Sequence, residues 1–260
     1  MNPVGKGSAA AEGSAVAEGS AVAEGSAVAE GSAVAEGSAV AEGSAHPPVH
    51  PLAATLDQGL DALGLALPCT ARDKLLAYVD LLVKWNSTYN LTAIRDSQAM
   101  VAAHLLDSLA IVRYLKPGNL LDVGSGGGLP SIPVAIWAEA AQPGLRVTAL
   151  DSNHKKTAFL RQAKAELKLA NLDVSGERVE AWEPPSKFSQ IVSRAFSDLY
   201  EFFHLTANQA APGAVWLAMK GVHPHEEIAQ LPAECKLDQV IPLKVPGLDA
   251  ERHLVVLKRA

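Results

Sequence analysis

The chain has 260 residues, 48% of them hydrophobic and 19% charged, which is enough apolar material for one buried core and an appendage. Its formal net charge is −6, but residues 1–45 contain six glutamates and one lysine, so the remainder is nearly neutral and RNA is not excluded as a partner. The two cysteines, Cys69 and Cys235, lie far apart without a CxxC or histidine pattern, which argues against a disulfide framework and a zinc site. We expect no bound metal.

Targeting signals are not evident in the sequence. No apolar stretch reaches the roughly 18 to 20 residues of a membrane span, and the opening MNPVGKGSAA lacks the apolar core of a signal peptide. We therefore expect a cytoplasmic protein that has no membrane partner. We also expect it to act as a monomer.

Residues 1–45 consist mainly of the hexapeptide AEGSAV, which repeats from Ala11 and decays before His46. Each repeat offers one valine, so it buries too little apolar area to offset about 1–2 kcal/mol per residue of backbone ordering. We predict a disordered tail over residues 1–45. The alternative is a left-handed β-helix, which also uses hexapeptides but needs more branched aliphatic residues and more turns.

Residues 46–118 have a helical period and are predicted to form a helical N-terminal segment. One helix face carries Leu52, Leu56, Leu60 and Leu63. A second segment opens at Thr70 and continues with Leu75, Leu76, Val79, Leu82 and Val83. A third runs from Ser97, a residue type that caps helices, to Tyr114, where Lys116-Pro117-Gly118 stops it.

Residues 119–260 alternate between short aliphatic runs and longer helical stretches. The predicted strands are Leu120–Val123, Arg146–Leu150, Asp173–Ser175, Ser189–Val192, Ala214–Met219, Leu237–Pro242 and His253–Lys258. The predicted helices are Ser131–Ala140, His154–Leu169, Leu199–Ala210 and His225–Leu231. This alternation predicts an α/β fold with a parallel sheet covered on both faces, whose last two strands pair as an antiparallel hairpin.

The first predicted strand ends in a glycine-rich turn, LLDVGSGGGLPSIP. A turn between a buried strand and a helix lets a ligand approach the bare backbone. Gly124, Gly126 and Gly128 have the spacing G-x-G-x-G, and Leu129 stands where the dinucleotide fingerprint has its third glycine. This mismatch disfavours a nicotinamide or flavin and favours a ligand without a pyrophosphate, such as S-adenosylmethionine.

Two acidic residues flank this turn. Asp151 directly follows the second predicted strand, at its C-terminal tip, where its carboxylate can accept the ribose hydroxyl protons of a nucleoside. Asp122 directly precedes the glycines and can orient either the loop or the ammonium group of the ligand. A glycine run followed by an acid at the next strand end favours a nucleoside-type cofactor.

Eight segments in order resemble a known family: WNSTYNLTAIRD, HLLDSL, DVGSGGGLPSIP, LDSNHKKTAFL, ERVEAW, IVSRAF, MKG and ERHLVVLK. The family is that of the bacterial small-subunit ribosomal RNA guanine-N7 methyltransferases, also called glucose-inhibited division protein B. The resemblance covers roughly residues 52–260. It implies a Rossmann-like class I S-adenosylmethionine-dependent methyltransferase domain over 119–260, preceded by a helical extension, that methylates N7 of a guanine in 16S ribosomal RNA.

The resemblance also implies site residues at Gly124, Leu129, Val179, Glu180 and Arg194, to which the pattern of the residues themselves adds Gly126 and Asp151. Cofactor contacts are expected at Gly124, Gly126, Leu129, Asp151, Val179, Glu180 and Arg194. Family members usually continue the turn as leucine, proline, glycine, whereas this chain has Ser131 in the last place. A serine there can cap the following helix, but it would be strained if the position required a positive φ.

The fourth predicted strand is followed by Ser193-Arg194-Ala195-Phe196 and not by the Asn/Asp-Pro-Pro-aromatic stretch of many methylases that act on exocyclic base amines. Guanine N7 is a free lone pair without a proton to remove, so its methylation needs positioning and water exclusion more than a base. We therefore expect no classical acid–base residue, with Arg194 contributing to positioning. Phe196 could stack on the base or belong to the core.

Candidate contacts to RNA are cationic or polar residues along the chain. They are Arg95, His104, Lys155, Lys156, Arg161, Lys220 and Arg252. For the three on the helix after Asp151, an ordinary solvated face is the competing interpretation. His104 and Asp107 lie one helical turn apart, so they can contact substrate or pair with each other.

Three other functions remain compatible with the residues alone. The chain could methylate a protein or a small molecule, it could be a ribosome-assembly factor that binds the cofactor only structurally, or it could be a nicotinamide oxidoreductase. Methyl transfer into small ribosomal subunits, or binding of NADH in place of S-adenosylmethionine, would distinguish among them.

Overall fold

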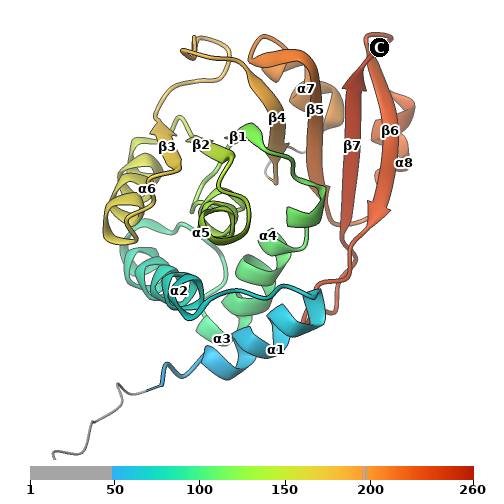
Figure 1. The fold of residues 1–260 in the computed structure, drawn as a ribbon. Helices are drawn as coiled ribbons and strands as arrows, with labels where there is room; N and C mark the ends of the chain where they lie inside the picture. Colours follow the sequence, from blue (N-terminus) through green and yellow to red (C-terminus); the bar gives the residue numbers. More distant parts are fainter. Residues whose placement is uncertain (1–48, 195, 197) are drawn as a thin grey trace, which may run out of the picture. The chain divides into compact units, whose positions relative to one another are not determined.

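The computed structural model describes residues 49–194, 196 and 198–260, which belong to one compact unit, Pro47–Ala260 (Figure 1). The tail predicted for residues 1–45 lies outside the described residues. None of the helices in the described part of the chain is long and apolar enough to cross a membrane.

Helices dominate the first part of the described chain, as the period predicted. They are α1 (Ala53–Leu63), α2 (Cys69–Tyr89), α3 (Ser97–Met100), the π-helical η1 (Val101–Leu106), α4 (Asp107–Leu109) and the 3₁₀ turn η2 (Val112–Tyr114). The leucine face of α1 is buried against η1. Gly64 ends α1 in the left-handed region at φ 69°, where glycine has no steric penalty.

The third predicted helix has a different N-cap residue from the one predicted. Asp96, and not Ser97, is its N-cap, because the Asp96 carboxylate accepts hydrogen bonds from the Gln98 and Ala99 amides at 3.3 and 3.0 Å. The helix is also interrupted by the π-helical turn η1. Such turns are rare and occur often at functional sites.

Seven strands form one sheet in the order β3-β2-β1-β4-β5-β7-β6. The strands are β1 (Gly118–Val123), β2 (Leu145–Leu150), β3 (Leu172–Ser175), β4 (Phe188–Ser193), β5 (Ala210–Lys220), β6 (Cys235–Pro242) and β7 (His253–Arg259). The first five are parallel, and β7 runs antiparallel between β5 and β6. The predicted α/β class and the terminal antiparallel pair are therefore confirmed.

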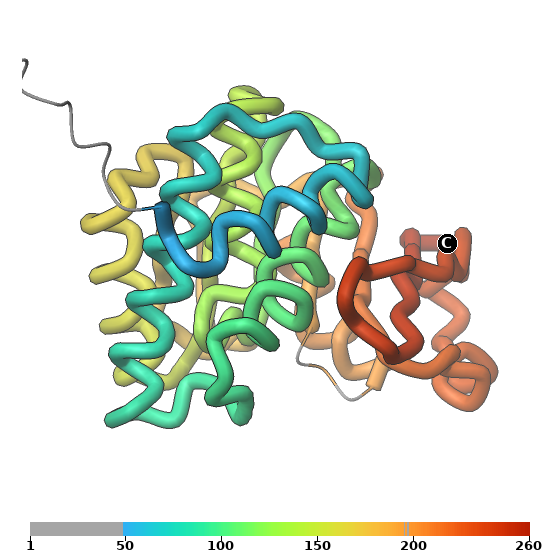
Figure 2. The backbone as a smooth tube through the Cα atoms, turned by 90° about the horizontal axis from the view of Figure 1, so that it is seen from below, coloured from blue at the N-terminus to red at the C-terminus, as the bar shows by residue number. Residues whose placement is uncertain are grey.

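The remaining helices are α5 (Ser131–Ala141), α6 (His154–Glu166), α7 (Leu199–Thr206) and α8 (His225–Ala229). Successive residues of a strand face opposite sides, so Leu120 belongs to the core that includes α1, α2, α5 and α6, while Leu121 belongs to the core that includes α7. Figure 2 shows the blue and green N-terminal helices beside α5 and α6, with the orange and red C-terminal strands at the other end.

The order of the strands indicates where a ligand would bind to this sheet. The sheet runs from β1 to β2 and β3 in one direction and from β1 to β4 and β5 in the other, which creates a switch point between β1 and β4. Ligands of open α/β sheets bind outside the carboxyl ends of the strands at such a point. Because β7 is antiparallel and His253 pairs with Lys220, the start of β7 lies at this same edge.

Candidate functional site

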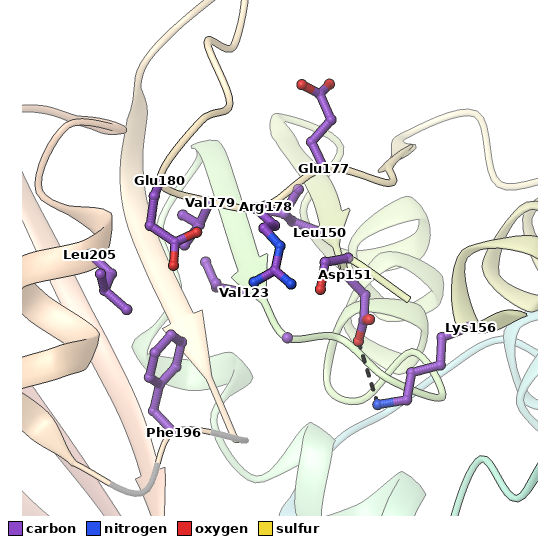
Figure 3. A pocket seen from close by; sticks show the side chains of 12 residues that line it. Val123, Leu150, Asp151, Lys156, Glu177, Arg178, Val179, Glu180, Phe196 and Leu205 are labelled. Atoms are coloured by element: carbon purple, nitrogen blue, oxygen red, sulfur yellow. Dashed lines mark ion pairs between the residues drawn. The ribbon is translucent and has the colours of Figure 1, made fainter. Parts of the chain in front are cut away.

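A cavity of about 340 Å³ lies at the carboxyl ends of β1 and β2, against the glycine turn (Figure 3). We call it the glycine-loop cavity. Its lining comes from the ends of β1 and β2, from the loops after β1, β2, β3 and β4, and from α6 and α7: Val123, Gly124, Leu150, Asp151, Ser152, Lys156, Glu177, Arg178, Val179, Glu180, Phe196 and Leu205. The structure thus brings together Gly124, Asp151, Val179 and Glu180, four of the residues expected at the cofactor.

The glycine turn needs its glycines for backbone geometry. Gly124, Gly126 and Gly128 have φ angles of 74°, 57° and 88°, a region that side chains disfavour. The Gly124 amide donates to the Leu150 carbonyl at 2.8 Å, which closes the turn over β2. Behind the turn, the buried Tyr78 hydroxyl donates to the Gly127 carbonyl at 2.5 Å. The turn is therefore a fixed wall of the cavity.

Asp151 joins the tip of β2 to this wall. Its two carboxylate oxygens accept hydrogen bonds from the Gly126 amide at 2.9 Å and from the Asn153 amide at 2.8 Å. The Lys156 ammonium lies 3.8 Å from the same carboxylate, the ion pair drawn in Figure 3. Asp151 is buried at the cavity wall, so it both holds the glycine turn and presents a negative group to a ligand.

Asp122 lies beneath the turn and is fully buried. Its carboxylate accepts a hydrogen bond from the Ser131 amide at 3.1 Å, so in this structure it supports the loop and the first turn of α5. Burial raises the pKa of Asp122 to about 6, with hydrogen bonds from Ser131 and Ser125 and the charge of Arg194 opposing the shift.

Ser131 does not cap α5, contrary to one of the two expectations for it. Pro130 occupies the cap position, no side chain caps the helix, and Ser131 is its first residue. Ser131 also lies outside the positive-φ region, so the serine causes no backbone strain. Position 131 is helical and therefore does not require a glycine.

The loop after β3 supplies the far wall. Its backbone is anchored by the buried Gln209 side chain, which donates to the Val179 and Trp182 carbonyls at 2.8 and 3.1 Å. In Figure 3, the Arg178 guanidinium lies between Val123 and Asp151 and points into the cavity. Sequence reasoning missed Arg178, although it directly precedes Val179 in the segment ERVEAW.

Gly126 and Leu129 do not line the cavity. The Gly126 amide donates to the Asp151 carboxylate, and Leu129 is buried in the hydrophobic core at 5% exposure. Phe196 lines the cavity and its ring also packs on Phe202, with centroids 5.4 Å apart; its stacking on a base stays a prediction.

A second cavity, of about 380 Å³, lies further along the same sheet edge. We call it the arginine cavity, because Arg194, Arg252 and Lys220 line it together with His104 and Asp107. Arg194, which was expected at the cofactor, therefore shares this cavity with three of the residues expected to contact RNA. It follows β4 directly, at the strand end that also leads to Phe196 in the glycine-loop cavity.

His104 and Asp107 do not pair with each other. The Asp107 carboxylate contacts Arg194 and Arg252, at 3.1 and 3.0 Å, and His104 Nε2 lies 2.9 Å from the Thr92 hydroxyl. Burial and the nearby Arg194 lower the pKa of His104 to about 4. His104 is therefore neutral at physiological pH.

The other candidate cations have different surroundings. Lys220 donates to the Phe196 carbonyl at 3.1 Å and to Glu227 at 2.6 Å. Arg95 donates to the Asn86 carbonyl and the Asn90 side chain, and lines neither cavity. Of the three cations on α6, Lys156 lines the glycine-loop cavity.

The pKa shifts of Asp122 and His104 have opposite effects on the stability of the fold over the same pH range. The folded pKa of Asp122 lies above its usual value, so its contribution to stability is present below about pH 4 and lost as the pH rises through about 6. The folded pKa of His104 lies below its usual value, so its contribution is present above about pH 6.5 and lost as the pH falls towards about 4. In the native protein these two dependences oppose each other.

We therefore expect Asp122→Asn, relative to the native protein, to become more stable as the pH rises from about 4 to 6, by about 2–3 kcal/mol. His104→Gln should change in the opposite direction over the same range. Urea unfolding at each pH measures both differences. Flat difference curves for both buried sites would contradict the prediction.

Comparison with known proteins shows extensive similarity. The family model described as rRNA small subunit methyltransferase G matches residues 71–255. The chain is 53% identical over 208 residues to the ribosomal RNA small subunit methyltransferase G of Aromatoleum aromaticum, which covers 80% of this chain and 99% of the relative. It is 56% identical over 203 residues to the protein of that name from Chromobacterium violaceum, which covers 78% and 95%. Among solved structures, the ribosomal protein L11 methylase of Lactobacillus delbrueckii subsp. bulgaricus covers 63% of this chain and 79% of its own, with a TM-score of 0.47 and 17% identity.

Proposed function

The chain belongs to the rRNA small subunit methyltransferase G family, and from this premise we propose that it transfers a methyl group from S-adenosylmethionine to N7 of a guanine in 16S ribosomal RNA. The observation that carries the proposal is the pair of cavities along one sheet edge. One has the groups that recognise a nucleoside, the other is basic, and the end of β4 contributes to both.

The residues of the glycine-loop cavity fit S-adenosylmethionine. Asp151 offers a buried carboxylate to ribose hydroxyls, while Val179 and Glu180 offer backbone and carboxylate groups to an adenine edge. The bare backbone at Gly124 leaves room for the amino-acid end of the ligand. When bound, S-adenosylmethionine supplies an electrophilic methyl group on a sulfonium centre.

The protein's own contribution is positioning. Guanine N7 carries a lone pair and no proton, so no side chain has to act as a base. His104, the buried imidazole of the arginine cavity, is held on Thr92. Arg194 lines the arginine cavity and Phe196 lines the glycine-loop cavity, so both can help to align the base against the methyl group.

The proposal extends to the partner and to the chain's organisation. The partner is 16S ribosomal RNA or a small-subunit particle in the cytoplasm, and the enzyme acts as a monomer. We propose residues 1–45 as a tail, 46–118 as the helical segment that carries His104 and Asp107 to the site, and 119–260 as the methyltransferase domain.

A mass-spectrometric map of methylated nucleosides tests this function. Deleting the gene should remove one N7-methylguanosine from 16S ribosomal RNA, and the native protein should restore it. Purified protein should transfer labelled methyl from S-adenosylmethionine into small subunits isolated from the deletion strain. An unchanged nucleoside map, or labelling of a protein or metabolite pool in place of the RNA, would overturn the proposal.

A further inference from the structure

Three adjacent strands deliver basic side chains to the arginine cavity. Arg194 follows the end of β4, Lys220 ends β5, and Arg252 directly precedes β7. In the sheet order β4-β5-β7, Ser193 pairs with Ala218 and Lys220 with His253, so the three positions fall at one edge. This convergence depends on the antiparallel direction of β7.

Asp107 meets two of these cations from the helical side. It directly follows the π-helical turn η1, and its side chain is only 2% exposed. One carboxylate oxygen lies 3.1 Å from Arg194 Nη1 and the other 3.0 Å from Arg252 Nε. A carboxylate buried to this degree is stable as a charged group only when it is paired, and here each oxygen has its own guanidinium.

The contacts leave a defined part of each guanidinium for a ligand. Arg194 Nη1 donates to Asp107 and to the Ala103 carbonyl, and Arg252 donates through Nε to Asp107 and through Nη1 to the Glu251 carbonyl. Among the described residues, the Nη2 groups of both arginines make no hydrogen bond. Both side chains are about one quarter exposed, at 27% and 26%. Asp107 therefore fixes the orientation of two donor groups that remain available.

The charges at this point favour an anion. Two guanidinium groups against one carboxylate leave a net charge of +1, and Lys220 is matched by Glu227. Planar guanidinium groups recognise phosphate oxygens with high geometric specificity. A phosphodiester carries one negative charge and therefore matches the pair.

We propose that Asp107 is a positioning residue that holds Arg194 and Arg252 as a clamp for one backbone phosphate of the RNA. That the phosphate belongs to RNA rests on the proposed function. The recognition of a phosphate group follows from the two arginines and Asp107 alone. Asp107 acts through the arginines and does not itself touch the ligand.

The test compares Asp107→Asn with Asp107→Glu. The asparagine keeps the size of the side chain but removes the charge that fixes both guanidinium groups, so kcat/KM for small-subunit RNA should fall by about 100-fold, mainly through KM. The glutamate should recover part of this loss. The dissociation constant of S-adenosylmethionine should change less than twofold in both variants, because the glycine-loop cavity does not include Asp107.

Asp238→Asn is the matched control, because it removes an ion pair with Lys258 that lies outside both cavities. It should leave both constants unchanged. A folded Asp107→Asn protein with native kcat/KM, or one that loses cofactor and RNA affinity equally, would overturn the positioning role.

A second measurement uses the native protein and inorganic phosphate. Phosphate should shift the side-chain NMR signals of Arg194 and Arg252 more than chloride at equal ionic strength, and unmoved signals would overturn the clamp even if the Asp107 variants failed to fold. The outcomes separate the two proposals. Phosphate-dependent shifts without any RNA methylation would refute the proposed function while supporting the clamp.

Discussion

Replacing Asp151 with alanine is expected to raise the dissociation constant of S-adenosylmethionine by about 10- to 100-fold. A hydrogen bond to a charged carboxylate contributes about 1.5–3 kcal/mol, and the ribose hydroxyls lose that acceptor in the variant. The structure adds a second cause, because the Gly126 and Asn153 amides lose their acceptor as well and the glycine turn loses its tie to β2. Isothermal titration calorimetry measures the change directly.

Asp173→Ala is the matched control for this experiment. Asp173 lies on the neighbouring strand β3, is about half exposed, and pairs with Lys164 and Arg146 outside the cavity. Its replacement should leave cofactor affinity unchanged. If Asp151→Ala bound the cofactor as tightly as the control does, Asp151 would not belong to the binding site.

Replacing Gly128 with alanine should destabilise the fold by about 2–5 kcal/mol, enough to remove a large part of the stability of a typical domain. Two costs combine at this position. The φ of 88° is unfavourable for any side chain, and a Cβ atom would lie 2.8 Å from Ile132 Cγ1 and 3.0 Å from Leu160 Cδ2, both in the buried core. The melting temperature and the yield of folded protein report the effect.

Gly126→Ala separates the two costs, because Gly126 also has a positive φ, of 57°, but the nearest atom to its Cβ would be the Gly124 carbonyl oxygen at 3.8 Å. This variant should lose only about 1–2 kcal/mol, from backbone strain alone. Equal destabilisation by the two alanines would contradict the argument that core packing behind the turn requires a glycine at position 128.

Local sequence signals predicted much of the fold. The seven strands and four helices after residue 118 all occur near their predicted positions, because strand and helix periods depend on residues close in the chain. The start of the third helix was the exception, since Asp96 and Ser97 are both good cap residues and only the backbone decides between them.

The convergence of four candidate site residues on one cavity could be predicted from the sequence, because each of them lies beyond the end of one strand. Gly124, Asp151, Val179 and Glu180 each follow a strand of the parallel part of the sheet, so they converge by a general rule of such folds. Leu129 lies in the same glycine turn, but its side chain is buried in the hydrophobic core. For Arg178, the only indication in the sequence was its position directly before Val179 and Glu180.

The sequence by itself determined the family, the α/β alternation and the glycine turn with Asp151, because each of these rests on residues adjacent in the chain or on ordered motifs. Only the tertiary structure decided which residues surround Arg194. Its partner Asp107 lies 87 residues away, and Arg252 lies 145 residues from the same carboxylate. Such contacts depend on the strand order and on the antiparallel direction of β7. The periodic pattern of neighbouring residues predicts strands and helices, but it predicts neither of these two features.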